Sequence, residues 1–506
     1  MEDEAIFTNS FPGSACYTVK KEVRYHRKRR LLRRGTVIRR QGGSSNTVMK
    51  LTEKYIETSR EFYVRLFQIA VPVILQSIIT TGVNLVDNIM LGQLTETALG
   101  ASTQANQFIT LFTFAVMGIS MGSSVLSSRF YGAKDMLSLK KVITIALRFG
   151  MILAAGFTAV SIFFPRQIIG LYFQGTETEI IAAGVTYLRW SIPSFLLMAI
   201  SLVCTNSMRS AGLTHVPLIA SACAFGINIG ANYIFIFGHL GAPAMGVAGA
   251  ALGTVIARVV EVTIILVFFF RDKTVHYRPR DFLLPCSELL PEFVRICIPV
   301  MLSDTLLGLG DNVLAIIMGQ IGTNFVTANS ITNVIQRVST IFITGLSFSG
   351  CFLTGQVLGE RRIKDAQRQG YTYAILGLLV GILASLIILV IAEPVIDAYN
   401  ISAETREIAF ELMDAVSVII IFRSTNSILT KGVLRGGGDT KFLLVADMST
   451  MWLLAVPLGA LAGLVLKLPA FWVYLFLHSD QIVKAVWCVF RLRSEKWIKK
   501  VKGVAL

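Results

Sequence analysis

Twelve apolar segments, each near the ~20 residues that a helix needs to cross a bilayer core, limit what this chain can fold into. The chain is 54% hydrophobic and only 15% charged, and its mean hydropathy is +0.64. A soluble domain of this length does not need so much apolar surface, so we predict an all-α polytopic membrane protein with twelve transmembrane helices. The segments are 66–91, 102–126, 142–164, 182–206, 215–237, 246–270, 292–318, 326–354, 370–392, 408–430, 441–464 and 468–490.

Basic residues between the segments predict the topology. The net charge is +16, and cytoplasmic loops of membrane proteins are enriched in Lys and Arg. We therefore place both termini in the cytoplasm, expect the plasma membrane as location, and expect contact with anionic lipid rather than nucleic acid. The opposite loops hold few basic residues, mainly Arg166, Arg406 and Lys467. The cytoplasmic set is Lys134, Lys140, Lys141, Arg209, Arg271, Lys273, Arg278, Arg280, Arg361, Arg362, Lys364, Lys431 and Arg435, followed by a basic tail at 491–506.

The first 48 residues do not resemble a folded domain. They hold 11 Lys or Arg against 4 acids, with a like-charge run at 24–40 and a Gly/Ser-rich linker at 41–47. An unstructured cytoplasmic tail is one interpretation, and an arm that binds headgroups or nucleic acid is the other. We expect residues 1–48 to be dispensable. Because Met49 opens a more regular stretch, the arm could also arise from an upstream start codon.

The two halves of the chain repeat at an offset of 227 residues. With six helices in each half, the repeats are parallel and related by an axis along the membrane normal. We predict two pseudo-symmetric lobes, 60–270 and 292–490, which flank a central cleft and are joined by a cytoplasmic loop at 271–291. Tandem lobes of this kind are typical of transporters that alternate access. The matched pairs include Pro72 and Pro299, Asn106 and Asn333, Gly118 and Gly345, Ser120 and Ser347, and Gly132 and Gly359.

The first segment carries a carboxylic acid inside the membrane. Gln76, Thr80, Asn84 and Asp87 are spaced four, four and three residues apart, so they share one helix face. An acid in a span is costly and usually faces a bundle interior or a wet cavity. The stripe is either a structural contact between helices or an ion or proton site. Burial disfavours the charged form of a carboxyl group, so Asp87 is a candidate to bind and release a proton during the transport cycle.

Five motifs in order resemble the multidrug and toxic compound extrusion (MATE) family over roughly residues 60–495. They are LVDNIMLGQL at 85–94, MRSAGLT at 208–214, NIGANYIFIFG at 228–238, GVAGAALGTVIARVVE at 246–261 and VLRGGGDT at 433–440. The resemblance implies an antiporter that expels organic, often cationic and amphiphilic compounds in exchange for entering protons or sodium ions. By position, Asp87 is similar to the family's N-lobe carboxylate and Asn228 to its fifth-helix asparagine. Asn232 stands where many members have an aspartate, so this position cannot titrate here.

The second half departs from the family pattern. Some members place acids on the seventh and tenth helices for sodium. The seventh-helix position looks like Leu307 here, with Asp304 and Asp311 shifted from it, and Asp414 lies too early in the tenth helix to match. We therefore expect coupling in the N-lobe. Gln104, Gln107, Asn333 and Gln336 are candidates to line the cleft together with Gln76 and Asn84, although structural contacts explain them as well. Arg258 and Glu261, three apart, are expected to pair, and Asp447 has no predicted partner.

The sequence lacks signatures of enzymes and metal sites. There is no GxxxxGK[ST] motif, so ATP is not expected as the energy source, and neither the five His nor the seven Cys have ligand spacing. We expect no cofactor besides the coupling ion, H+ or Na+, and a monomer with small organic molecules and the lipid bilayer as partners. Two rival functions stay open: a lipid-linked oligosaccharide flippase of the same superfold, and a membrane scaffold that does not transport.

Overall fold

The computed structural model of the protein describes residues 56–170, 178–399 and 401–501, and the arm at 1–48 lies outside these residues. The described chain is built from helices and short loops, as predicted. Six long helices and one short helix come from the first half, which we call the N-bundle. They are α3 (Arg60–Gly92), α4 (Glu96–Gly132), α5 (Met136–Phe163), α6 (Pro165–Gly170), α7 (Thr178–Ser210), α8 (His215–Phe237) and α9 (Val247–Arg271).

The second half forms the C-bundle after a loop with one 3-10 turn, η1 (Pro279–Leu283). In the described part of the chain it has six long helical segments, which we call rods. The fourth is α13 continued by the π-helical η2, the fifth runs from α14 to η4 with alternating α and π geometry, and the sixth is the bent pair α16 and α17. The elements are α10 (Leu290–Ile321), α11 (Thr323–Gly359), α12 (Ile363–Asp397), α13 (Ala403–Ser427), η2 (Ile428–Leu434), α14 (Thr440–Thr450), η3 (Met451–Ala455), α15 (Val456–Ala460), η4 (Leu461–Val465), α16 (Ala470–Leu477) and α17 (Ser479–Arg493).

Among the described residues, ten helices are long and apolar enough to cross a membrane, and the pair α16 and α17, bent by 45°, adds an eleventh. The twelfth predicted span, 408–430, falls on α13 and η2. This segment is not among the ten because it carries charged side chains, including Glu404, Arg406, Glu407 and Glu411 in its first turns. Four of the charges lie at one end, where Arg406 pairs with Asp397 at 2.6 Å on the surface, and Asp414, Arg423 and Lys431 follow further along. Each of the twelve predicted segments therefore falls on one helical rod.

The contact between the two bundles has an internal two-fold symmetry. A Cβ atom added to Gly132 on α4 would lie 2.1 Å from the carbonyl oxygen of Gln356 on α11. A Cβ atom added to Gly359 on α11 would lie 2.1 Å from the carbonyl oxygen of Arg129 on α4. Adding the repeat offset of 227 to residues 132 and 129 gives 359 and 356, so the two contacts are equivalent. The parallel relation of the repeats predicts such an exchange.

A second pair of contacts obeys the same symmetry one helix further out. Gly118 on α4 approaches Met301 on α10, with 2.4 Å between an added Cβ and the Met301 Cα. Its equivalent, Gly345 on α11, approaches Ile74 on α3, with 2.4 Å between an added Cβ and Cγ1. Small residues let membrane helices pack with their backbones in close approach. Glycine at these positions therefore sets how closely the bundles meet.

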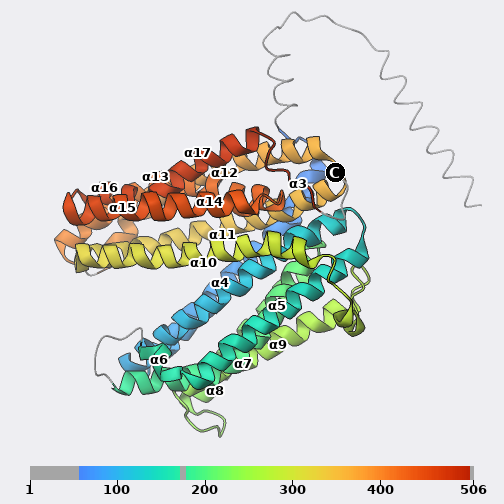
Figure 1. Cartoon of the computed structure of the whole chain (residues 1–506). Coiled ribbons are helices and arrows are strands. Elements are labelled where there is room, and N and C mark those ends of the chain that lie inside the picture. Colours follow the sequence, from blue (N-terminus) through green and yellow to red (C-terminus); the bar gives the residue numbers. More distant parts are fainter. Residues whose placement is uncertain (1–55, 171–177, 400, 502–506) are drawn as a thin grey trace, which may run out of the picture. The chain divides into compact units, whose positions relative to one another are not determined.

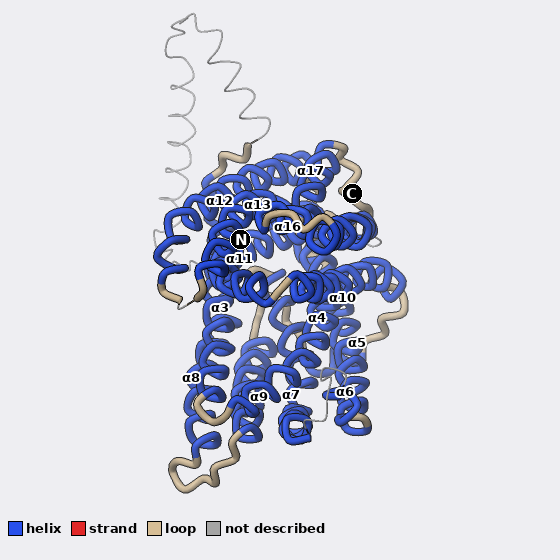
Figure 2. Tube along the Cα trace, turned by 90° about the vertical axis from the view of Figure 1, so that its left-hand side faces the viewer, coloured by secondary structure: helices blue, strands red, loops and turns tan. Residues whose placement is uncertain are grey.

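The bundles meet at one end and separate toward the other (Figure 1). The contacts between them join α3 and α4 to α10 and α11, which the view turned by 90° also places side by side (Figure 2). The close glycine contacts use the first half of α3 and α10 and the second half of α4 and α11. These halves lie on the side of the protein that the basic loops predict to face the cytoplasm.

Several residues assigned to cytoplasmic loops lie elsewhere, and those assignments were wrong. Arg209 is in the last turn of α7, Lys431 is in η2, and Arg435 lies in the helical turn that follows. Arg209 and Arg435 are buried because each has hydrogen-bond partners inside its bundle. The basic tail assigned to 491–506 also begins inside α17, and Trp497 beyond it is fully buried.

Candidate functional site

The carboxylate of Asp87 contacts the two asparagines of α8. The side-chain N–H of Asn232 donates to Asp87 Oδ1 at 2.5 Å and lies 3.4 Å from Asn228 Oδ1. Both asparagines are buried, whereas Asp87 is only partly buried. Since Asn228 and Asn232 are one turn apart, their side chains face the same way. The structure thus brings together the three residues predicted to form the coupling site.

The neighbouring helix α9 is shaped to admit this cluster. At Gly253, an added Cβ atom would lie 2.2 Å from Asn232 Oδ1, so any larger residue would displace the amide. On the same helix, Arg258 donates to Glu261 at 2.6 Å, which confirms the predicted pair. Arg258 is thus paired with Glu261, and among the described residues Asp87 has no ion-pair partner.

Two polar atoms of the cluster have no hydrogen-bond partner in the described protein. They are Asn232 Oδ1 and Asn228 Nδ2, in the assigned amide orientations. Buried polar atoms without partners are uncommon, because each costs the desolvation of that group. The arrangement of one carboxylate, one free amide oxygen and one free amide N–H suits a small guest: a proton on Asp87, or a cation held by oxygen atoms.

The remainder of the polar stripe on α3 has a different environment. Gln76 donates to Ser221 Oγ at 2.8 Å and accepts from the buried guanidinium of Arg209. It lies eleven residues before Asp87, which is about 16 Å along a helix. Gln76 is half-buried and held by partners within the N-bundle, which is the structural contact that the sequence left open as one interpretation. Asn84, between them, is exposed.

Of the other predicted cleft residues, some are accessible and one is held by structural contacts. Gln107 and Asn333 are exposed and Gln104 is half-buried, so these side chains are accessible. Gln336 is buried, donates to Tyr474 Oη at 2.5 Å and accepts from Arg423. The prediction that Gln336 lines the cleft was wrong, because both ends of its amide are held by partners within the C-bundle.

Asp304 and Asp447 of the C-bundle have basic partners that the sequence did not reveal. Asp304 receives two hydrogen bonds from Arg435, at 2.8 and 3.0 Å. Asp447 pairs with Lys484 at 2.9 Å, and Lys484 also lies 3.5 Å from Asp480. The i,i+4 spacing of Asp480 and Lys484 inside an apolar segment was a usable signal. Asp414 is exposed on α13.

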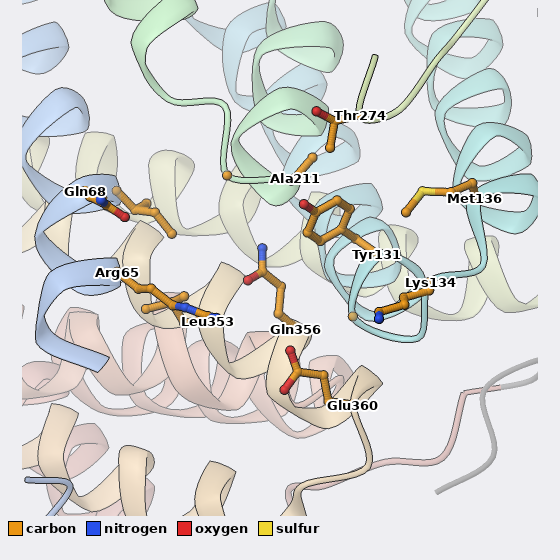
Figure 3. Close-up of a pocket in the computed structure, with 13 residues that line it drawn as sticks. Arg65, Gln68, Tyr131, Lys134, Met136, Ala211, Thr274, Leu353, Gln356 and Glu360 are labelled. Carbon is orange, nitrogen blue, oxygen red and sulfur yellow. The ribbon is translucent and has the colours of Figure 1, made fainter. Parts of the chain in front are cut away.

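A cavity of about 470 Å³ lies at the end where the bundles meet (Figure 3). Arg65 and Gln68 of α3 face it from one side, and Tyr131 and Lys134 from the other. Glu360 lies at its edge, beyond the end of α11. No group of three His, Cys, Asp or Glu side chains able to hold a metal ion occurs in the described part of the chain.

The sequence model of the MatE family matches residues 72–234 and again residues 299–461. The second match begins at 299 against 72 and ends at 461 against 234, which is an offset of 227. The uncharacterized transporter YisQ of Bacillus subtilis is 22% identical over 435 residues, 86% of this chain and 95% of YisQ. The probable multidrug resistance protein NorM of Thermotoga maritima is 23% identical over 442 residues, 86% of this chain and 93% of NorM.

Solved structures show the same fold. A MATE crystal structure in the straight conformation aligns with a TM-score of 0.77 at 19% identity, covering 87% of this chain and 100% of that chain. An outward-facing multidrug resistance MATE family transporter aligns with a TM-score of 0.76 at 21% identity, covering 85% and 96%.

Proposed function

Because the chain belongs to the MatE family, we propose that it is a secondary active exporter of organic, cationic amphiphilic compounds. The family consists of transporters, so we assign transport and no catalytic reaction. The observation that carries the proposal is the Asp87 carboxylate, held at 2.5 Å by Asn232 beside two buried polar atoms without partners. The names of relatives such as NorM support drug-like substrates.

Asp87 would couple export to an inward flow of H+ or Na+. The neutral carboxyl group tolerates a closed, dry environment, and the ionised group requires water, a cation or a cationic substrate. A ligand shifts a conformational equilibrium only through different affinities for the two states. Protonation of Asp87 satisfies this condition, because the neutral side chain favours one state and the ionised side chain favours the other. The protonation of Asp87 in turn depends on the pH of the compartment to which the site is open.

The arrangement of the bundles supports alternation between two states. Contacts at the predicted cytoplasmic end close that side, and the bundles separate toward the other end (Figure 1). We propose that this arrangement is an outward-facing state, with Asp87, on the second half of α3, toward the end where the bundles separate. We propose a monomer in the plasma membrane with both termini in the cytoplasm.

Uptake into proteoliposomes tests the proposal. The full chain is reconstituted and an inward or outward pH gradient, or a sodium gradient at constant pH, is imposed while a cationic dye is followed by fluorescence. We expect the dye to move when a gradient is imposed, and the gradient that drives the movement, of protons or of sodium, identifies the coupling ion. Movement of a lipid-linked oligosaccharide without movement of the dye would favour the flippase, and movement of neither would favour a scaffold.

A further inference from the structure

The C-bundle contains a second polar cavity, of about 230 Å³, in which basic residues outnumber acidic ones. We propose that it binds the carboxylate of zwitterionic organic substrates, through Arg423 and Lys431. The inference rests on the proposed export function and specifies its substrate class. The charged residues that line the cavity are Arg423, Lys431, Arg435 and Lys484, against Asp311, Asp447 and Asp480.

Most of these charges already compensate one another. Lys484 lies between Asp447 and Asp480, and all three side chains are almost inaccessible, with exposures of 3 to 5%. Asp447 also accepts a hydrogen bond from Ser303. Arg435 holds Asp304 in a two-bond contact. Buried charges with such partners are structural. Lys484 offsets only one of its two acids, so Asp447 and Asp480 together keep one negative charge at the cavity wall.

Arg423 and Lys431 are the cations that remain. Arg423 donates to Gln336, a neutral amide, and Lys431 is exposed; among the described residues neither has a carboxylate within ion-pair distance. Tyr474 fixes the amide of Gln336 through a 2.5 Å hydrogen bond, so the guanidinium is held in position with donors to spare. A guanidinium presents a planar set of donors that matches a carboxylate.

The helix geometry brings both cations to one cavity. Arg423 is in the last turns of α13, and Lys431 follows in the π-helical η2. π-helical turns change the direction in which side chains leave a helix and are frequent at functional sites. Arg423 and Lys431 line the same cavity together with Asp311 of α10.

Asp311 gives the cavity a second pole. It lines the cavity together with Arg423 and Lys431, and it makes no ion pair at contact distance in the described part of the chain. A ligand with both a carboxylate and an amine complements this arrangement: the carboxylate binds the two cations, and the amine faces Asp311. A small cation alone is disfavoured, because Arg423 and Lys431 repel it. The C-bundle cavity and the Asp87 site thus differ in the charge that they accept.

Two dyes that differ in one group test the inference. Rhodamine 110 has a free carboxylate and is a zwitterion, and rhodamine 123 is its cationic methyl ester. Binding to the purified full chain is followed by fluorescence anisotropy. We expect Arg423→Gln and Lys431→Gln each to raise the Kd of rhodamine 110 at least tenfold and to leave that of rhodamine 123 within twofold. Lys273→Gln, which removes one exposed loop charge, is the matched control and should change neither value.

Binding of rhodamine 123 also reports that the variants are folded. Equal weakening of both dyes, or no change for rhodamine 110, would overturn the inference. Transport of rhodamine 123 by the unmodified protein in proteoliposomes separates the two proposals. If rhodamine 123 is transported but the variants do not selectively lose rhodamine 110 binding, the cavity assignment fails and the exporter stands. If the variants selectively lose rhodamine 110 binding but rhodamine 123 is not transported, the cavity remains a binding site and export is rejected.

Discussion

The guanidinium of Arg129 on α4 donates to the main-chain carbonyl of Lys499, 370 residues further along the chain, at 2.6 Å. It also donates to the carbonyl of Gly437 at 2.5 Å. Arg129 is fully buried, and the side chain of Lys499 pairs with Asp439 at 3.2 Å. One N-bundle residue thus fastens the C-terminal segment and the turn before α14 at the end where the bundles meet.

Arg129→Gln should loosen this end. A shorter neutral side chain leaves the carbonyls of Gly437 and Lys499 without their donor, and hydrogen bonds to charged groups contribute about 1.5–3 kcal/mol each. With two such bonds lost, we expect the free energy of unfolding to fall by about 3–6 kcal/mol and trypsin to cleave near Lys499 more rapidly. Arg65→Gln is the control, since its pair with Glu61 is exposed. Unchanged proteolysis at Lys499 would show that the segment is held by other contacts.

The two glycines at the symmetric crossing should be sensitive to one methyl group. In Gly132→Ala the new Cβ meets the carbonyl oxygen of Gln356 at 2.1 Å, so α4 and α11 must move apart. We expect a loss of about 1–3 kcal/mol of stability, typical of overpacking, and higher reactivity of buried Cys297 toward a maleimide. Gly156→Ala is the control because an added Cβ there meets no atom within 4 Å. Equal behaviour of the two variants would contradict the close approach.

The pair between Arg435 and Asp304 should behave as a buried ion pair. Removing one partner, as in Arg435→Met, leaves a carboxylate without compensation and should cost about 3–5 kcal/mol. Removing both, in Arg435→Met with Asp304→Leu, should restore most of that loss, because no charge is then left buried. Thermal or denaturant unfolding of the two variants in detergent checks this. Additive losses would mean that the residues act independently.

Asp281, in the loop between the bundles, should make stability depend on pH. Partial burial raises its pKa, but the N–H of Arg278 and the ammonium of Lys140 outweigh burial and hold the pKa below its usual value. The ionised form therefore stabilises the fold above the unfolded pKa of about 4, and this stabilisation is lost as the pH falls through the folded pKa. Asp281→Asn should lower stability at pH 7 by up to about 1 kcal/mol, with little difference from the unmodified protein at pH 3. A difference that persists at pH 3 would assign the effect to packing.

Local patterns were sufficient to predict the helices and the repeat. The apolar segment 215–237 coincides with α8, and the pairing of Gly132 with Gly359 reappears as a symmetric contact. The contact of Asp87 with Asn232 was also predictable, because each residue lies on a polar face within an apolar helix and the family resemblance placed both in one site.

Partners distant in sequence could not be predicted. Arg435 was assigned to a loop because a basic residue at the end of an apolar segment usually faces water. It is buried because Asp304, 131 residues earlier, neutralises it across two helices. Gln336 was likewise expected in the cleft, and only the positions of Tyr474 and Arg423 explain why it is buried. No local pattern contains such pairings.

The most direct test of the account is dye efflux by Asp87→Asn in proteoliposomes with an imposed pH or sodium gradient. Asparagine keeps the size of the side chain and its carbonyl oxygen, so the hydrogen bond from Asn232 can persist and the protein should fold and insert. What is lost is the alternation between a charged and a neutral state. Asp397→Asn, at an exposed surface pair, is the matched control and should retain full activity. The account predicts that Asp87→Asn abolishes gradient-driven efflux, whereas efflux at the rate of the unmodified protein would place the coupling elsewhere.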